Sequence, residues 1–305
     1  MICRNKEVLI DTLLPKLAAS FAASGHSIEE PEIILFPLAR KLLLLRQASR
    51  FSKLLSNLFA ANNKANLHSL ILEATFAYQF ESANKPLNYE VRCRSDDEMT
   101  IDFYRRIPSG KNLYMEMRQV NQRLAITDLI DEQLGQSNFY EVHLGGNDDR
   151  ADTLRLQRLI LSKAQDSEGN LIKFSLGGPD DYNIIVVEVS DLHLGMIDHF
   201  DCMLVTYGDP MVPEFARRDI FGLFQEDRHD HPALIHEFVA KFSMFRSTIH
   251  GILFLWKHHK SYPSDFELEF FLVHNNNLIT HTNCLEIADD MRGAMNPRHF
   301  QGNQT

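Results

Sequence analysis

A pattern of two paired strands at residues 99–120 constrains the fold of this chain more than any other feature. Two stretches of alternating apolar and polar residues flank a Pro-Ser-Gly turn. If residues 108–110 form a three-residue hairpin loop with the glycine in the left-handed conformation, Asp102 faces Glu116 across the strands. Side chains repeat every two residues along a strand, so Arg118 shares the face of Glu116.

Two opposed carboxylates on this hairpin indicate a cation site. Directly opposed residues in an antiparallel pair have Cβ atoms about 5 Å apart. Carboxylates that close repel each other unless a cation lies between them, and Mg²⁺ binds such oxygen ligands. We therefore expect a metal site at Asp102 and Glu116 with the guanidinium of Arg118 beside it. The alternative is a solvated strand face on which Arg105, Arg106 or Arg118 pairs with the two acids.

The composition is that of an ordinary globular protein. The chain has 305 residues, of which 44% are hydrophobic and 24% charged, and its four cysteines form no CxxC pair. We therefore expect neither a zinc ribbon nor a disulfide framework. We also expect the protein to occupy a reducing compartment. The N-terminus lacks a signal-peptide pattern, and the longest apolar runs, such as Ile252–Trp256, are too short to span a bilayer. The sequence thus predicts a cytoplasmic protein without a membrane partner.

The net charge of −10 argues against a whole surface built for nucleic acid, because phosphate contacts need positive charge. It still permits a basic groove on an acidic protein. The clearest basic stretch comprises Arg40, Lys41, Arg46, Arg50 and Lys53. The alternative is that these residues form the solvated side of a helix.

Apolar periodicity outlines the remaining elements, with a turn at 275–277 and a disordered tail at 291–305. It predicts helices at 6–60, 65–80, 123–134, 152–164 and 232–258, and strands at 87–94, 139–144, 182–189, 199–207 and 266–273. The order of a helix, three strands, a helix and a strand predicts an α/β core with helical extensions at both ends.

This arrangement resembles the PD-(D/E)xK nuclease superfamily, which has the restriction endonuclease-like fold. That family has a helix, a three-stranded meander, a second helix and a further strand. It carries an Asp on the second strand, a Glu on the third strand two residues before a Lys, and in many members a Glu on the first helix. Asp102, Glu116 and Glu73 match these acids, and Arg118 stands where the family has Lys. The segment that ends near Tyr207 also resembles bacterial members.

The resemblance implies a restriction endonuclease-like mixed sheet flanked by helices. We expect a helical N-terminal extension (1–64), a C-terminal helix and strand packed on the core (211–290) and the tail (291–305) around the nuclease-like core (65–210) that the resemblance covers. The resemblance also implies that Glu73, Asp102 and Glu116 hold one or two Mg²⁺ or Mn²⁺ ions, so that the metal activates a water molecule for phosphodiester cleavage in DNA.

The role of Arg118 leaves two functions open, because Arg stays charged and does not readily accept a proton. Arg118 would orient the attacking water or bind the phosphate of a working nuclease. The alternative is a non-catalytic nuclease-fold protein that acts as a nucleic-acid-binding or protein-interaction module. The partners expected are accordingly DNA, a protein or a second copy of the chain as a homodimer.

Five of the fourteen histidines gather in two groups, which comprise His193 with His199, and His229 with His231 and His236. Neither group matches a zinc signature, and we expect these histidines in loops or on the surface.

Overall fold

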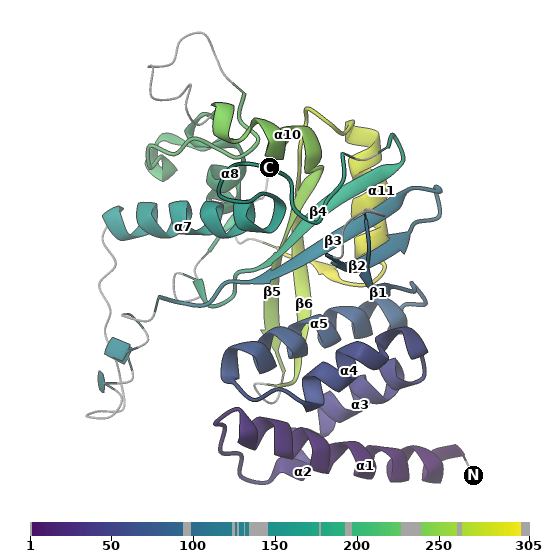
Figure 1. Ribbon diagram of the computed structural model, residues 1–305. Helices are drawn as coiled ribbons and strands as arrows, with labels where there is room; N and C mark the ends of the chain where they lie inside the picture. Colours follow the sequence, from purple (N-terminus) through teal and green to yellow (C-terminus); the bar gives the residue numbers. More distant parts are fainter. Residues whose placement is uncertain are drawn as a thin grey trace.

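One mixed sheet, whose strands are ordered as they occur in the chain, organises the described part of the protein (Figure 1). The computed structural model describes residues 2–93, 99–123, 126, 128–130, 132–133, 146–176, 178–192, 197–226, 239–260 and 264–299. The strands are β1 (Asn88–Val91), β2 (Ile101–Arg106), β3 (Asn112–Gln119), β4 (Asp181–Glu188), β5 (Gly251–His259), β6 (Phe266–His274) and β7 (Asn296–Pro297). β1 to β3 form an antiparallel meander, β3 to β5 are parallel, β6 is antiparallel to β5, and β7 is parallel to β6.

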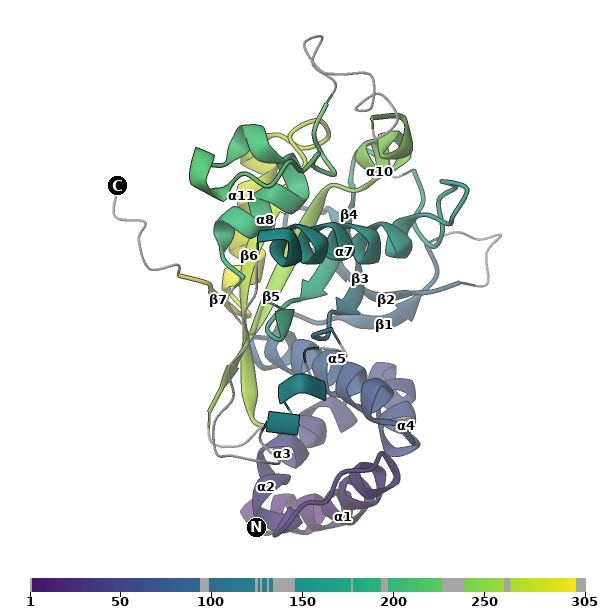
Figure 2. The same cartoon turned by 90° about the vertical axis from the view of Figure 1, so that its left-hand side faces the viewer.

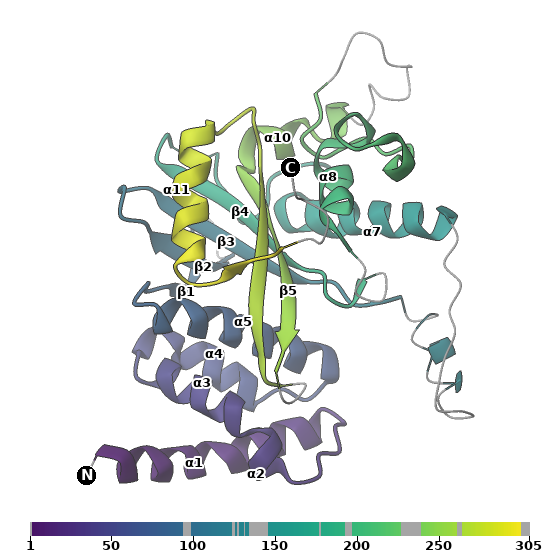
Figure 3. The same ribbon diagram turned by 180° about the vertical axis from the view of Figure 1, so that it is seen from behind.

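Helices cover both faces of this sheet, and Figures 2 and 3 show α7 and α11 on opposite sides of the strands. One face carries α1 (Ile2–Ala23), α2 (Pro31–Ile34), α3 (Phe36–Arg46), α4 (Ser52–Phe59), α5 (Lys64–Ser82) and α11 (His281–Arg292). The other face carries α7 (Gly146–Ala164), α8 (His199–Tyr207) and α10 (Ser243–Thr248). Within the N-terminal helices, α5 lies against the sheet and α1 lies farthest from it (Figure 1).

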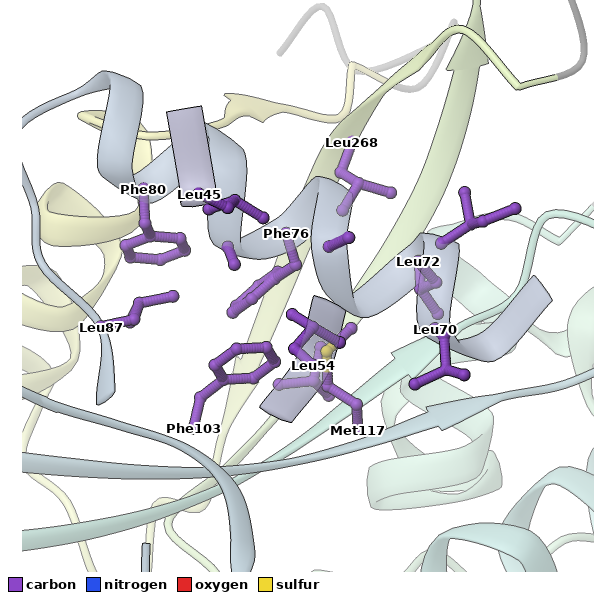
Figure 4. Close-up of a cluster of buried hydrophobic side chains, with 14 of the residues drawn as sticks. Leu45, Leu54, Leu70, Leu72, Phe76, Phe80, Leu87, Phe103, Met117 and Leu268 are labelled. Carbon is purple, nitrogen blue, oxygen red and sulfur yellow. The ribbon is translucent and has the colours of Figure 1, made fainter. Parts of the chain in front are cut away.

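The core beneath α5 is built from large apolar side chains of elements that are distant in sequence. Phe76 and Phe80 of α5 pack with Phe103 of β2, Met117 of β3 and Leu268 of β6 (Figure 4). Each fully buried side chain of this size stabilises the fold by about 1.5–3 kcal/mol. The N-terminal helices are therefore packed into the same core as the sheet.

The predicted hairpin is confirmed in loop and in register. The Ile107 N–H donates to the Lys111 carbonyl and the Gly110 N–H donates to the Ile107 carbonyl, both at 2.9 Å. Gly110 has a φ of +89°, the left-handed conformation that glycine adopts without a steric penalty. Phe103 pairs with Met115 in the observed register, so the next positions along the two strands bring Asp102 opposite Glu116.

The predicted α/β class with a mixed sheet flanked by helices is confirmed, but the helix predicted at 232–258 is wrong. Ser243–Thr248 forms α10, and Gly251–His259 forms β5, a strand in the middle of the sheet. Residues 252–256 are buried on both faces. A continuous apolar run shows neither the period of a helix nor that of a strand, so periodicity could not separate the two.

The strand predicted at 199–207 is also wrong, because this segment forms α8. Asp198 caps the helix by accepting hydrogen bonds from the N–H groups of Phe200 and Asp201, and the Asp201 carboxylate accepts one from the Asp198 N–H. This reciprocal capping box satisfies backbone donors that the first helical turn leaves free.

The C-terminal segment adds to the sheet and to the core. β5 and β6 continue the sheet beyond β4. Met291 and Met295 are buried, and Asn296–Pro297 pairs with β6, so the part of the predicted tail that the structure describes is ordered.

Some predicted features lie outside the described residues, namely the strand at 139–144, most of the helix at 123–134, residues 300–305, and His193, His229, His231 and His236. Every helix in the described part of the chain is too short or too polar to cross a bilayer.

Candidate active site

Asp102 and Glu116 lie on the α7 face of the hairpin. Their strands carry Tyr104 and Tyr114 on the same face, with ring centroids 5.2 Å apart. The Oδ2 atom of Asp102 accepts a hydrogen bond of 2.7 Å from the Met117 N–H. The Asp102 carboxylate is therefore held against β3, next to Glu116.

Glu116 is fully buried and binds two lysines. Its Oε1 atom accepts hydrogen bonds from the Nζ atoms of Lys163, at 2.7 Å, and Lys173, at 2.5 Å. Its Oε2 atom is buried and accepts no hydrogen bond from the described residues. A buried carboxylate needs counterions, and here α7 and the segment after it supply them.

Lys173 reaches Glu116 from a strained backbone position. Its φ of +63° lies in the left-handed region, which costs a residue with a Cβ about 1–3 kcal/mol. On one side, the Ile172 N–H donates to the Ala164 carbonyl at the end of α7, and on the other the Phe174 side chain is buried. The flanking residues thus hold Lys173 in the conformation that directs its ammonium group to the acid.

Glu73 joins the acids from α5. Its two carboxylate oxygens accept hydrogen bonds from the Ser69 hydroxyl, at 3.3 Å, and from the Tyr89 hydroxyl, at 2.8 Å. Burial raises the pKa of Glu73, and the Glu116 carboxylate adds to this shift, against the opposing effects of the two hydroxyls and Lys163. The same burial and the nearness of Glu73 raise the pKa of Tyr89, which stays a hydrogen-bond donor.

The three acids and two lysines influence one another electrostatically. Burial raises the pKa of Asp102 to about 7, and the carboxylates of Glu116 and Glu73 contribute to this rise, while Lys163 opposes it. Burial by itself would lower the pKa of Lys173, but attraction to the three carboxylates raises it overall. The three acids that the hairpin and the preceding helix suggested thus lie within electrostatic range of one another, and we call these five residues the acid–lysine cluster.

Arg118 lies on the same strand face but belongs to another group of charges. Its Nε atom is buried and has no hydrogen-bond partner among the described residues, and its charge helps to lower the pKa of Arg155. Arg155 and Arg123 both pair with the buried carboxylate of Asp152, at 3.9 and 3.0 Å. Within the described residues, lysines and not Arg118 form the ion pairs with Glu116.

Lys163 and Lys173 were not among the residues suggested by the sequence. Lys163 falls three residues after Ile160 and seven after Leu156, so it occupies a position on the apolar stripe of its helix. Lys173 stands between Ile172 and Phe174. A lysine on a buried stripe and a lysine enclosed by apolar residues are the signals that could have found them.

Arg105, which the alternative interpretation of the hairpin named among the partners of the acids, points to the opposite face. It forms a bidentate pair with Asp290 of α11, with Nε–Oδ2 and Nη2–Oδ1 distances of 2.9 and 3.1 Å. Alternation along β2 places Arg105 on the side of Phe103, so the hairpin sets it apart from Asp102. Of the three arginines in that alternative, Arg105 is therefore wrong as a partner of Asp102 and Glu116.

The basic stretch at 40–53 is largely paired within the fold. Lys41 is buried and donates to the Phe266 carbonyl, Arg50 pairs with Glu81, and Lys53 pairs with Glu90.

The acid–lysine cluster suits a divalent cation in the type and charge of its groups. Three carboxylates face two ammonium groups, and the Oε2 atom of Glu116 has no hydrogen-bond partner among the described residues. Burial, and after it the charges of Glu116 and Glu73, raise the pKa of Asp102, so a cation at this place would offset unfavourable negative charge. Among the described residues, no three His, Cys, Asp or Glu side chains are drawn together tightly enough to form a ready ligand set. Binding of a metal would therefore require the acids to close around it and the lysines to move from Glu116.

No protein-family model, curated protein or solved structure matches this chain. The described residues define an α/β protein with a charged cluster buried beside its central strands.

A Lys173→Met variant is expected to lower the free energy of unfolding at pH 8 by about 1–3 kcal/mol, because Glu116 loses one of its two counterions. Chemical denaturation measures the loss. Lys260→Met is the control, since Lys260 pairs on the surface with Glu267 and should cost little. In a Glu116→Gln background the effect of Lys173→Met should shrink; an unchanged effect would show that the two side chains are not coupled.

Proposed function

We propose that this chain is a metal-dependent nuclease with the restriction endonuclease-like fold, which hydrolyses a phosphodiester bond in DNA with Mg²⁺ or Mn²⁺. The observation that carries the proposal is that Asp102 and Glu116 oppose each other on the hairpin, with Glu73 of α5 near enough for its charge to raise the pKa of Asp102. The order α5, β1, β2, β3, α7 and β4 supports it, because it matches the helix, meander, helix and strand of that fold.

In this proposal the three carboxylates hold the metal, and Lys163 and Lys173 act beside it. The metal, when bound, lowers the pKa of a water molecule and offsets charge on the scissile phosphate. The lysines offer the ammonium groups that the family motif would place at position 118. Because the pKa of Lys173 is raised, its ammonium keeps its proton and is suited to bind a phosphate oxygen rather than to act as a base.

Arginines beside the acid–lysine cluster offer a path for the phosphate backbone. Burial lowers the pKa of Arg155, and the neighbouring charges of Arg123, Arg118 and Arg158 lower it further, against the attraction of Asp152. Crowded positive charges of this kind would be relieved by a bound phosphate. An overall acidic chain can in this way present a locally basic face.

The direct test is cleavage of labelled double- and single-stranded DNA by the full chain with Mg²⁺, Mn²⁺ or EDTA. We expect nicks with either metal and none with EDTA. DNA binding without cleavage under every condition would contradict the nuclease and favour the alternative, a non-catalytic nuclease-fold module. The observation that favours this alternative is that lysines already neutralise Glu116.

DNA affinity is expected to fall linearly on a plot of log affinity against log salt concentration, because each phosphate contact releases counterions. Arg158→Gln removes an exposed guanidinium of α7 that lies near Arg155 and should reduce the magnitude of this slope by about 1. Fluorescence anisotropy in EDTA measures binding without cleavage. Arg292→Gln, on α11 at the opposite face, is the matched control and should leave the slope unchanged. Equal slopes for both variants would place the DNA elsewhere.

A further inference from the structure

A cavity of about 420 Å³ lies where the N-terminal helices meet the ends of β5 and β6. Phe21 of α1, Ile71 of α5 and Phe266 of β6 form apolar parts of its wall. In Figures 1 and 3, β5 and β6 extend past the other strands to reach these helices. The volume is within the range of cavities that bind small molecules, which is about 300–1,000 Å³.

Two histidines give this cavity a polar and aromatic edge. The rings of His26 and His68 have centroids 5.1 Å apart and an interplanar angle of 32°. The Nε2 atom of His26 is buried and has no hydrogen-bond partner among the described residues. A buried polar atom without a partner costs free energy, so its position on the cavity wall points to a ligand that supplies the missing hydrogen bond.

Both imidazoles are held in the neutral form. Burial lowers the pKa of His26, with a contribution from Lys64. Burial also lowers the pKa of His68 to about 4, with contributions from His26, Lys257 and Lys64 and against the opposing effect of Asp191. A neutral imidazole has one N–H donor and one nitrogen acceptor. The pair therefore offers both kinds of hydrogen bond at neutral pH.

The ammonium group on the charged side of the cavity is already paired with carboxylates. The Lys257 ammonium lies 2.9 Å from the Glu188 carboxylate and 3.7 Å from that of Asp191, and it lies over the ring of Phe266. The ligand that suits this combination is a flat, uncharged ring with both donors and acceptors at its edge, rather than an anion. Aromatic walls bind nucleobases by stacking, and polar groups at the edge bind them by hydrogen bonds.

The cavity shares α5 with the acid–lysine cluster. His68 precedes Glu73 by five residues, a separation of about 7.5 Å along the helix axis. We propose that this cavity receives an unpaired nucleobase of the strand whose phosphate lies at the acids, so that the substrate is single-stranded or locally unpaired. This inference rests on the proposed nuclease function and adds a substrate class to it.

Binding in EDTA tests the cavity separately from catalysis. We use the full chain and titrate it calorimetrically with deoxyadenosine monophosphate and with 2-deoxyribose 5-phosphate, which lacks the base. A single-stranded decamer and its duplex are compared in the same buffer. We expect the nucleotide to bind at least about tenfold more tightly than the sugar phosphate, and the single strand at least about fivefold more tightly than the duplex.

Variants of the wall identify the cavity as the binding place. His68→Phe keeps the ring but removes its nitrogens, and Ser27→Trp adds an indole at an exposed position on the cavity wall. Each should weaken nucleotide binding by about five- to tenfold. His258→Phe, on an exposed side chain of β5 outside the cavity wall, is the matched control and should bind as the wild type does. If His68→Phe unfolds in a thermal scan, Ser27→Trp decides the question.

The outcomes separate this inference from the nuclease proposal. Equal binding of nucleotide and sugar phosphate, or wall variants that bind as the wild type does, would overturn the base-binding cavity even if the chain cuts DNA with Mg²⁺. If the nucleotide binds but the single-stranded decamer binds no more tightly than the duplex, the assignment to a substrate base is overturned. The cavity would then be a site for free nucleotides. The third outcome is that binding depends on the base and is lost in the wall variants, while the chain does not cleave DNA. This result would support the base-binding cavity and contradict the nuclease proposal.

Discussion

An Asp102→Asn variant is expected to lose Mg²⁺-dependent DNA cleavage by at least about 100-fold and to become more stable at pH 8. Asn keeps the shape of Asp and can still accept the hydrogen bond from the Met117 N–H, but it lacks the charge that would hold a metal. Activity and metal affinity should therefore fall together. Cleavage assays and calorimetric titration with Mn²⁺ measure the two effects.

The gain in stability follows from the pKa of Asp102. Burial and the neighbouring carboxylates raise this pKa from 3.8 to about 7, so the folded chain binds the proton more tightly than the unfolded chain does. Stability is then lost as the pH rises through this window, because ionisation is disfavoured in the folded state. Asn does not ionise, and the variant should gain on the order of 4 kcal/mol at pH 8 and nothing near pH 3.

Urea denaturation at several pH values checks this result. Asp180→Asn is the matched control, since 71% of the Asp180 side chain is exposed and the substitution should leave both activity and stability nearly unchanged. If Asp102→Asn is less stable than the wild type at pH 8, the Asp102 carboxylate stabilises the folded state. A variant that is more stable yet cleaves normally would exclude Asp102 from the chemistry.

An Asp290→Ala variant is expected to lower the free energy of unfolding by about 3–5 kcal/mol. The Asp290 side chain is 3% exposed and binds Arg105 through two contacts and Lys85 at 2.9 Å. Its removal leaves the buried guanidinium of Arg105 without its counterion, which costs more than the pair contributes when intact. Chemical denaturation of the two proteins at neutral pH measures the loss.

The neighbouring residue provides the control for this experiment. Asp289 also pairs with an arginine, Arg292, but 69% of its side chain is exposed, so Asp289→Ala should cost less than about 1 kcal/mol. Arg105→Met combined with Asp290→Ala should recover part of the stability, because an apolar side chain removes the unpaired buried charge. Similar losses for Asp289→Ala and Asp290→Ala would contradict the buried pair as an anchor of α11.

The parts of this protein that could be predicted from sequence rest on local interactions. The register that opposes Asp102 to Glu116 follows from strand alternation and from the positive φ of Gly110, both of which act within 22 residues. The helix that carries Glu73 likewise follows from its apolar spacing and from the Asn63 cap, which accepts a hydrogen bond from the Asn66 N–H. For these features, the residues that determine the local structure lie next to it in the sequence.

Only the tertiary structure decided the counterions of the acids and the identity of the central strand β5. Lys163 and Lys173 are 47 and 57 residues from Glu116 in sequence, and they reach it because α7 packs on the sheet. Gly251–His259 became a strand because β4 and β6 lie on either side of it, whereas its apolar run suits a buried helix equally well. The cavity between α1, α5 and β5 likewise joins segments more than 180 residues apart. Local periodicity can mark a residue as buried, but it does not specify its distant partner, because such contacts form only when distant surfaces exclude water together.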